Sequence, residues 1–114
     1  MVIARSLSEC VEYIDTNTTF YIRPLRHRVM LRMHELDDAD QVELLIRAGI
    51  SGWKNMQHNG VPIDSAHETA SIGGIEVLNA LSLESFDALP LTIITKLSHE
   101  ILRVNQVTEE QAGN

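Results

Sequence analysis

The sequence predicts a small, mainly helical α+β domain with a short antiparallel sheet and a long C-terminal helix. The chain has 114 residues, of which 44% are apolar, so we expect one domain over residues 1–114. Five aromatic residues are too few to build the core, so aliphatic side chains must supply it, which favours helices packed on a small sheet. The sheet is predicted from a strand near 18–23 and a hairpin near 53–63.

The N-terminal third is predicted to contain a helix and then the strand. Leu7, Val11 and Ile14 are spaced by four and three, which is typical of a short amphipathic helix over residues 6–14. The sequence "TTFYIR" at 18–23 is β-branched and aromatic and predicts a strand. Pro24 ends that strand and fits the first position of the next helix.

Two helices follow in the middle of the chain. In residues 24–36 one apolar stripe recurs at steps of four, four and three, formed by Leu25, Val29, Met33 and Leu36. Asp37 or Asp38 is expected to cap a second helix with Val42, Leu45 and Ile46 on its buried face, and Gly49 is expected to end it.

Beyond residue 50 the strongest signal is Asn59-Gly60, which supplies the positive φ angles of a two-residue hairpin turn. Pro62 must then lie at an edge or an end of its strand. Residues 64–74 are expected to form a loop. Gly73-Gly74 is interpreted as a hinge into a short helix that carries Val77, Leu78 and Leu81.

Pro90 opens the last predicted helix, and a frayed tail is expected from about residue 107. The apolar residues of this helix cover more than one face, which is typical of a central core helix or of a face shared with a partner. The residues expected to bind a partner are Leu91, Ile94, Leu97, Ile101 and Leu102.

Charge and composition narrow the function classes. Nine Lys plus Arg stand against sixteen Asp plus Glu, a formal charge of −7, which disfavours nucleic-acid binding and favours a protein that binds other proteins. The N-terminal segment has no apolar run for a signal peptide, and no segment has the roughly eighteen apolar residues of a membrane span. We therefore expect no membrane association and a cytoplasmic location.

Residues 42–60 also resemble a DNA-binding helix-turn-helix at Ala48-Gly49-Ile50-Ser51. The segment in the place of the recognition helix, "SGWKNMQHNG", carries one cation and ends in turn residues, so the hairpin interpretation is preferred. A DNA-binding regulator would instead need a basic surface on phosphates, formed by Arg23, Arg26, Arg28 and Arg32.

The sequence offers no catalytic or metal-binding motif. The five histidines lack the spacing of a zinc site, and Cys10 is the only cysteine, so a disulfide within the chain and a Cys-based metal site are excluded. No Gly-x-Ser-x-Gly element occurs, and Gly73-Gly74 is too short for a phosphate loop. We expect no enzymatic activity, no cofactor and no metal ion, and Trp53 is interpreted as a core side chain.

In order along the chain, "FYIRPL" (20–25), "AGISGWKNMQHNGVPI" (48–63) and "ALPLTIITKLSHEI…VTEEQAGN" (88–114) resemble the tail assembly chaperones of long, flexible-tailed bacteriophages. That family has an aromatic strand with an Arg-x-Leu-like end, a Gly-Trp segment before an Asp/Asn-Gly hairpin, and a C-terminal helix with a Glu-rich tail. The chain departs from this pattern at Gln57-His58 and in the additional segment 64–79.

The resemblance implies a non-enzymatic chaperone that binds the tape measure protein, keeps it soluble, promotes tail tube assembly and is absent from the mature tail. It also implies a homo-oligomer in the host cytoplasm. A longer, frameshifted form would recruit the tail tube protein. The alternatives are the helix-turn-helix regulator and a structural head-tail connector subunit.

Overall fold

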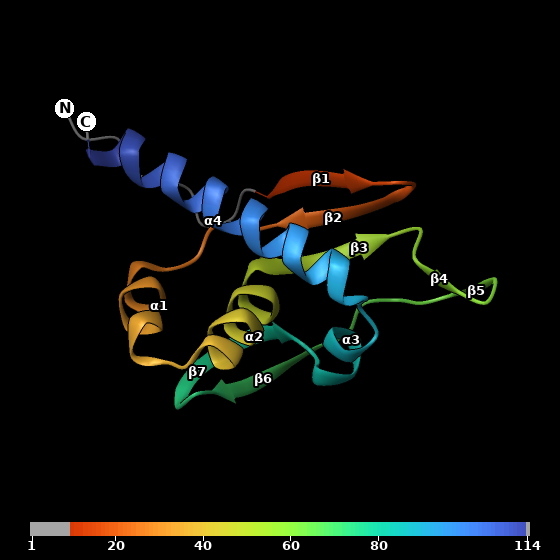
Figure 1. The fold of residues 1–114 in the computed structure, drawn as a ribbon, viewed down its shortest axis with the longest axis horizontal. Coiled ribbons are helices and arrows are strands. Elements are labelled where there is room, and N and C mark those ends of the chain that lie inside the picture. Colours follow the sequence, from red (N-terminus) through yellow and green to blue (C-terminus); the bar gives the residue numbers. More distant parts are fainter. Residues whose placement is uncertain (1–9, 114) are drawn as a thin grey trace.

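The computed structural model describes the backbone of residues 10–113 and the side chains of residues 10–105. The chain forms a compact α+β domain, 43% helical and 33% strand (Figure 1). The strands are β1 (Val11–Asp15), β2 (Thr18–Ile22), β3 (Ile50–Lys54), β4 (Gln57–His58), β5 (Val61–Pro62), β6 (His67–Ile72) and β7 (Ile75–Leu81). The helices are α1 (His27–Arg32), the 3-10 helix η1 (Met33–Glu35), α2 (Asp38–Gly49), α3 (Leu83–Asp87) and α4 (Leu91–Gly113).

The largest sheet is antiparallel and has the order β1-β2-β3. The predicted strand at 18–23 is confirmed as β2, which forms the centre of this sheet because Phe20 and Ile22 are buried. β3 follows α2 without a loop, so Gly49 ends the helix as expected. Because residues 50–54 are a strand, the chain has no second helix where a helix-turn-helix would need one.

The prediction of a helix over residues 6–14 is wrong where the structure describes this segment. Residues 11–15 form β1, which pairs with β2 across the two-residue turn Thr16-Asn17, while residues 6–9 lie outside the described part of the chain. Thr16 adopts a left-handed φ of 56°, which allows the tight reversal. Pairing with β2 therefore outweighs a helical spacing that rests on only three apolar residues.

The Asn59-Gly60 turn is confirmed, with φ angles of 52° and 79°. It joins only β4 and β5, which form a separate two-stranded ribbon, whereas Trp53 lies in β3 and pairs with β2. The hairpin predicted near 53–63 is thus divided between two sheets. Ile63 follows β5 and is partly buried against the core. Its N–H donates a hydrogen bond of 2.8 Å to the carbonyl of Met56.

Residues 64–66 have no regular secondary structure, as predicted. The predictions of a loop over 67–74 and of a helix through residues 77–81 are wrong. These residues form the β6–β7 hairpin, whose turn Gly73-Gly74 has φ angles of 58° and 83°. Glycine adopts such angles without strain, so the pair makes a two-residue hairpin turn and not a hinge. A bulge at Asn79 (φ 54°) shifts the alternation, so that Ile75 and Val77 and then Ala80 and Leu81 are buried.

The predicted helix over 24–36 is shorter than expected. α1 begins at His27, and Pro24 belongs to the extended segment before it and not to the first helical turn. The apolar stripe is nevertheless confirmed, because Leu25, Val29 and Met33 are buried and Leu36 packs against the core. Asp37 is confirmed as the cap of α2, since its carboxylate accepts a hydrogen bond of 2.8 Å from the N–H of Asp40.

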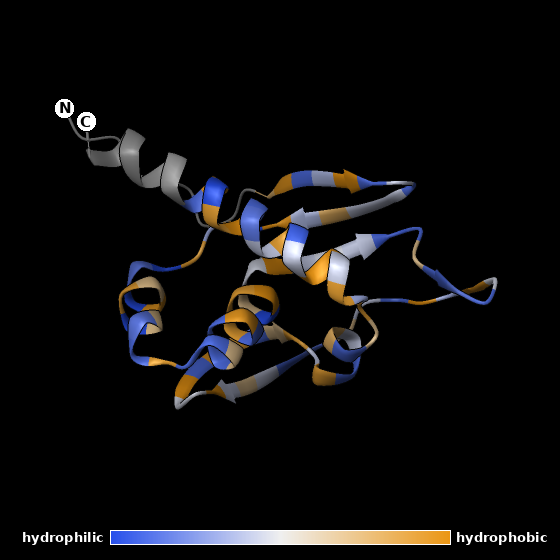
Figure 2. Ribbon diagram, viewed as in Figure 1, coloured by the Kyte–Doolittle hydropathy of each residue, from blue (hydrophilic) through white to orange (hydrophobic). Residues whose placement is uncertain are grey.

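The core lies between α2, the inner face of α4 and the sheets, and hydrophobic residues gather along α2 and the first turns of α4 (Figure 2). α4 begins directly after Pro90, whose carbonyl accepts hydrogen bonds of 3.0 Å from the N–H groups of Ile93 and Ile94. The helix runs to Gly113 and thus includes the tail expected to fray from about residue 107; side chains after Asn105 are outside the described residues. Buried Asn105 accepts a 2.7 Å hydrogen bond from the N–H of Leu25, which joins α4 to the segment before α1.

Candidate functional site

The residues of α4 expected to bind a partner do not share one surface. Leu97 and Ile101 are fully buried in the core, so they cannot contact a partner in this conformation. Ile94 and Leu102 are partly buried against that core. Leu91 is 78% exposed at the first turn. The wide apolar surface of α4 is therefore explained mainly by its central position, and only the first turn offers an exposed apolar side chain among the five.

An apolar groove of about 560 Å³ lies beside this first turn. Its apolar walls come from β2, the β4–β5 ribbon and the start of α4, through Phe20, Met56, Ile63, Pro90 and Ile93. Polar residues of the β1–β2 turn, β4 and α3 surround these walls. We call this site the α4 groove. Its shape and chemistry suit an apolar side chain presented by another protein.

Trp53 is confirmed as a core residue, and it contacts two residues that line the α4 groove, Phe20 and Ile63. Its side chain is buried, its indole N–H donates a 2.9 Å hydrogen bond to the carbonyl of Ile63, and its ring meets the ring of Phe20 edge-on at 6.2 Å. Such a pair fixes β3 against the chain that leaves β5. Trp53 therefore positions two groove residues and is not itself a ligand platform.

Asp15 and Lys96 form an ion pair at the rim of the α4 groove, with 2.9 Å between Nζ and Oδ2. The hydrogen bond from Lys96 holds the pKa of the Asp15 carboxyl below its ordinary value, and the same bond raises the pKa of Lys96. The pair joins the β1–β2 turn to α4, two segments that are far apart in the sequence.

A second cavity, of about 510 Å³, lies between α1 and β7. We call it the arginine cleft, because Arg23, Arg26, Arg28 and Arg32 all line it. Its other residues are Pro24, Leu25, Val29, Ala48, Ile75, Glu76, Val77, Leu78 and Asn79. The four arginines are evident in the sequence, but the position of β7 opposite them is not, because the pattern of residues 64–81 predicts a loop and a helix.

The four arginines of this cleft differ in their partners. Arg23 is partly buried, and its guanidinium donates to the carbonyls of Ala48 at 2.7 Å and Asn79 at 2.6 Å. Burial lowers the pKa of Arg23 from its ordinary value. Arg32 is 3.8 Å from exposed Glu35, which is a weak ion pair. Within the described side chains, Arg26 and Arg28 have no ion-pair partner.

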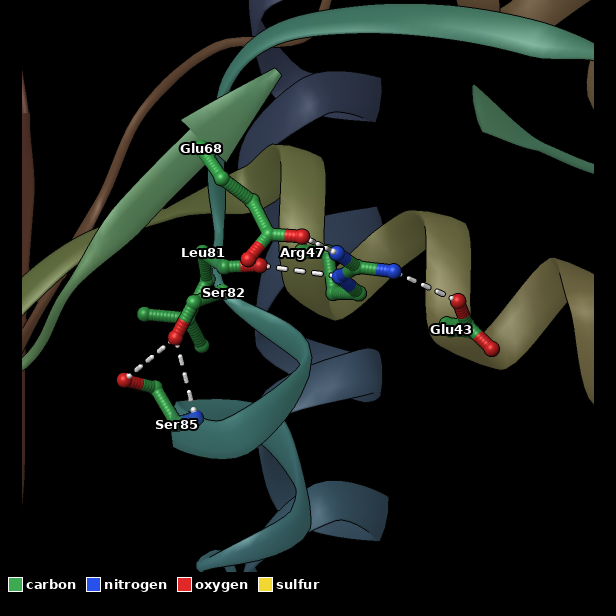
Figure 3. Close-up of polar contacts among 6 residues, drawn as sticks. All are labelled: Glu43, Arg47, Glu68, Leu81, Ser82 and Ser85. Atoms are coloured by element: carbon green, nitrogen blue, oxygen red, sulfur yellow. Dashed lines mark hydrogen bonds and ion pairs between the residues drawn. The ribbon is translucent and has the colours of Figure 1, made fainter. Parts of the chain in front are cut away.

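A third polar cluster surrounds Arg47, which is only 4% exposed (Figure 3). Its guanidinium donates to the carbonyl of Leu81 at 2.8 Å and to the carboxylates of Glu43 at 2.8 Å and Glu68 at 3.1 Å. Close by, Ser82 caps α3 by accepting a hydrogen bond from the N–H of Ser85. These contacts tie α2 to the β6–β7 hairpin, which gives the cluster a structural role.

Among residues 10–105, no three His, Cys, Asp or Glu side chains come together in a way that could hold a metal ion. Cys10 is exposed, with its Sγ 3.4 Å from the hydroxyl of Ser51. In the part of the chain that was described, no helix is both long enough and apolar enough to cross a membrane.

Comparisons with known protein families, with curated proteins and with solved structures gave no match to this chain.

Proposed function

We propose that this protein is a non-enzymatic tail assembly chaperone of a long-tailed bacteriophage. In this proposal it binds the tape measure protein, keeps it soluble while the tail tube assembles around it, and leaves before the tail is mature. The family resemblance of residues 20–25, 48–63 and 88–114 suggests the partner. The observation that carries the proposal is the α4 groove together with exposed Leu91 in the first turn of α4, because apolar side chains that are open to solvent can be covered by a partner protein.

The groove is proposed to hold apolar side chains from a helical stretch of the tape measure protein. A long helical protein exposes apolar stripes that aggregate, and many copies of a small chaperone can cover them. The net charge of −7 per copy would keep such an assembly dispersed. Weak binding at many points would also let tail tube subunits displace the chaperone later.

In this proposal the five residues that were expected to bind a partner have different roles. Leu91 contacts the partner directly, Ile94 and Leu102 lie on the flanks of α4, and buried Leu97 and Ile101 hold the helix in place. The protein is proposed to work in the host cytoplasm as a homo-oligomer. A longer form made by ribosomal frameshifting would recruit the tail tube protein.

Co-expression with the tape measure protein of the same phage tests the proposal. We expect the partner to stay in the soluble fraction and to co-elute with this chain, and we expect purified phage particles to lack it. A tape measure protein that precipitates at the same level with and without this chain would overturn the proposal. A chain that remains in purified particles would support the connector alternative instead.

A further inference from the structure

The arginine cleft lies at the opposite end of the molecule from the α4 groove, beside α1 and the β6–β7 turn (Figure 1). Tape binding in the groove does not use it. We propose that the cleft binds an extended acidic segment of a partner protein, which adds as a strand to the free edge of β7 and pairs its carboxylates with Arg26, Arg28 and Arg32. This inference does not rest on the proposed chaperone function.

The first observation is unneutralised positive charge on one wall. Arg28 and Arg32 are four residues apart on α1, and both line the cleft together with Arg26. Like charges at this spacing slightly destabilise a helix. Arg32 has one long ion pair with Glu35, and Arg26 and Arg28 have none among the described side chains. Since the fold does not use these two guanidinium groups, they are available to an external carboxylate.

The second observation is the free edge of β7 on the opposite wall. Ile72 and Ile75 flank the two-residue Gly73-Gly74 turn, so they exchange the first hydrogen bonds of the hairpin. The N–H and C=O of the next residue, Glu76, therefore face away from β6, and Glu76 is one of the residues that line the cleft. Within the described residues no hydrogen bond to these two groups is found. An incoming strand can satisfy both.

The residues at the floor of the cleft determine how the proposed acidic segment is oriented. Leu25, Val29 and Val77 are buried beneath it, and Arg23 is held in place by the carbonyls of Ala48 and Asn79. Glu76 on the β7 wall repels carboxylates, whereas the α1 wall attracts them. Because alternate side chains of a strand face opposite sides, a segment with an acid at every second position can point its apolar residues at the floor and its acids at the mouth of the cleft, where Arg26, Arg28 and Arg32 are exposed.

The same arginines could contact the phosphates of a nucleic acid, but three observations favour a peptide. None of the described residues that line the cleft is aromatic, so none of them offers a ring on which a base could stack, and acidic Glu76 is among them. The chain as a whole carries −7. The free strand edge provides a donor and an acceptor with the spacing of a peptide backbone. The occupant is therefore an acidic, extended segment of a protein.

Fluorescence anisotropy with a labelled synthetic peptide of alternating Glu and Val tests the proposal at low salt on the full chain. We expect saturable binding that Arg28→Glu/Arg32→Glu weakens by at least about tenfold, with the neutral pair Arg28→Gln/Arg32→Gln between the wild type and that variant. The matched control is Lys54→Glu/Arg103→Glu, which removes the same charge from exposed positions outside the cleft and is expected to change the affinity by less than about twofold. Circular dichroism shows that each variant is folded.

Two further readouts separate strand addition from unspecific attraction. The amide N–H signal of Glu76 is expected to shift on binding, and a peptide with N-methyl groups on alternate backbone nitrogens is expected to bind at least about fivefold more weakly. Absence of saturable binding, or equal losses in the cleft and control variants, would overturn the proposal. So would tighter cleft-dependent binding of a single-stranded DNA oligonucleotide than of the peptide, which would make the site a nucleic-acid site.

Discussion

At the scale of single residues, Arg47 carries a charge at a position with 4% exposure. A buried charge is tolerated only when it is paired and its donors are satisfied. Arg47 meets both conditions, because two carboxylates and the Leu81 carbonyl accept from it. The cluster therefore fixes the β6–β7 hairpin, including the free edge of β7, relative to α2.

Replacing this guanidinium tests its structural role. Arg47→Met leaves the Leu81 carbonyl and two carboxylates without their donor, so we expect the free energy of unfolding to fall by about 3 kcal/mol. Urea denaturation followed by circular dichroism measures it. Arg103→Met, which removes an exposed ion pair with Glu100, is the control and is expected to leave the midpoint unchanged. Equal losses in the two variants would contradict the role of Arg47.

The pair of Asp15 and Lys96 gives a prediction for pH. The pKa of Asp15 is lowered in the folded protein, so its contribution to stability is present above the ordinary pKa of about 4 and is lost as the pH falls through the lowered value. We expect Lys96→Met to return the pKa of Asp15 towards its ordinary value. Titration of the Asp15 carboxyl by carbon NMR in the wild type and in the variant measures this. An unchanged Asp15 titration would show that the pair does not form.

Sequence patterns correctly predicted those features that depend only on residues close to one another in the chain. The spacing of apolar residues predicts the buried stripe of Leu25, Val29 and Met33, and the structure confirms it. The ability of a carboxylate to accept a hydrogen bond in the first turn of a helix predicts the cap at Asp37, which is also confirmed. The burial of Arg47 could not be predicted. Two of its three acceptors, Leu81 and Glu68, come from a hairpin that lies far away in the sequence.

At the scale of elements, the packing of α2 on α4 depends on Gly49. A Cβ atom at this position would lie 2.9 Å from both Cδ1 and Cγ2 of Ile101. Gly49 therefore both ends α2 and lets the core side chain of α4 approach its backbone. The first role is predictable from the glycine itself, whereas the second requires knowledge of which helix lies opposite.

Gly49→Ala tests this contact. We expect it to destabilise the fold by about 1 kcal/mol, because crowding against Ile101 outweighs the gain in helix propensity. Ile101→Val removes one of the crowded methyl groups, so the double variant is expected to be more stable than the sum of the two single losses. A strictly additive cycle, measured by urea denaturation, would show that Gly49 and Ile101 do not interact.

Strand pairing explains the errors at element scale. The segment 67–81 contains polar residues and two adjacent glycines, and its alternation is interrupted by the bulge at Asn79, so no regular period marks β6 and β7. The segment 11–15 has apolar residues at positions that fit both periods. In both places the deciding contribution is a neighbouring strand, which a single sequence does not reveal.

At the scale of the whole molecule, the two cavities divide the surface between two kinds of contact. The α4 groove is apolar and lies at the end formed by the β4–β5 ribbon and the start of α4, whereas the arginine cleft is basic and lies beside α1 (Figures 1 and 2). The sequence identified the apolar helix and the arginines separately. The groove and the cleft need the tertiary arrangement, because each combines segments that are far apart in the chain.

Exposed leucines in two helices, Leu91 in α4 and Leu31 in α1, provide a test variant and its matched control. Leu91→Asp places an acid in the first turn of α4, where the helix dipole favours it, so folding is preserved. In the proposed chaperone function Leu91 contacts the partner, so we expect this variant to keep much less tape measure protein soluble than the wild type does. Leu31→Asp, at a leucine of α1 with similar exposure, is expected to retain it in the same co-expression assay. If both variants kept the tape measure protein equally soluble, the tape-binding surface would have to lie away from the first turn of α4.

The most direct test of the central claim is light scattering after a tape measure protein is diluted from denaturant into buffer with increasing amounts of this chain. We predict that scattering falls in a dose-dependent manner and reaches its minimum at a molar excess of the chain, since many copies are needed to cover a long partner. Aggregation that proceeds equally with this chain and with an unrelated acidic protein of the same size would contradict the proposed chaperone function.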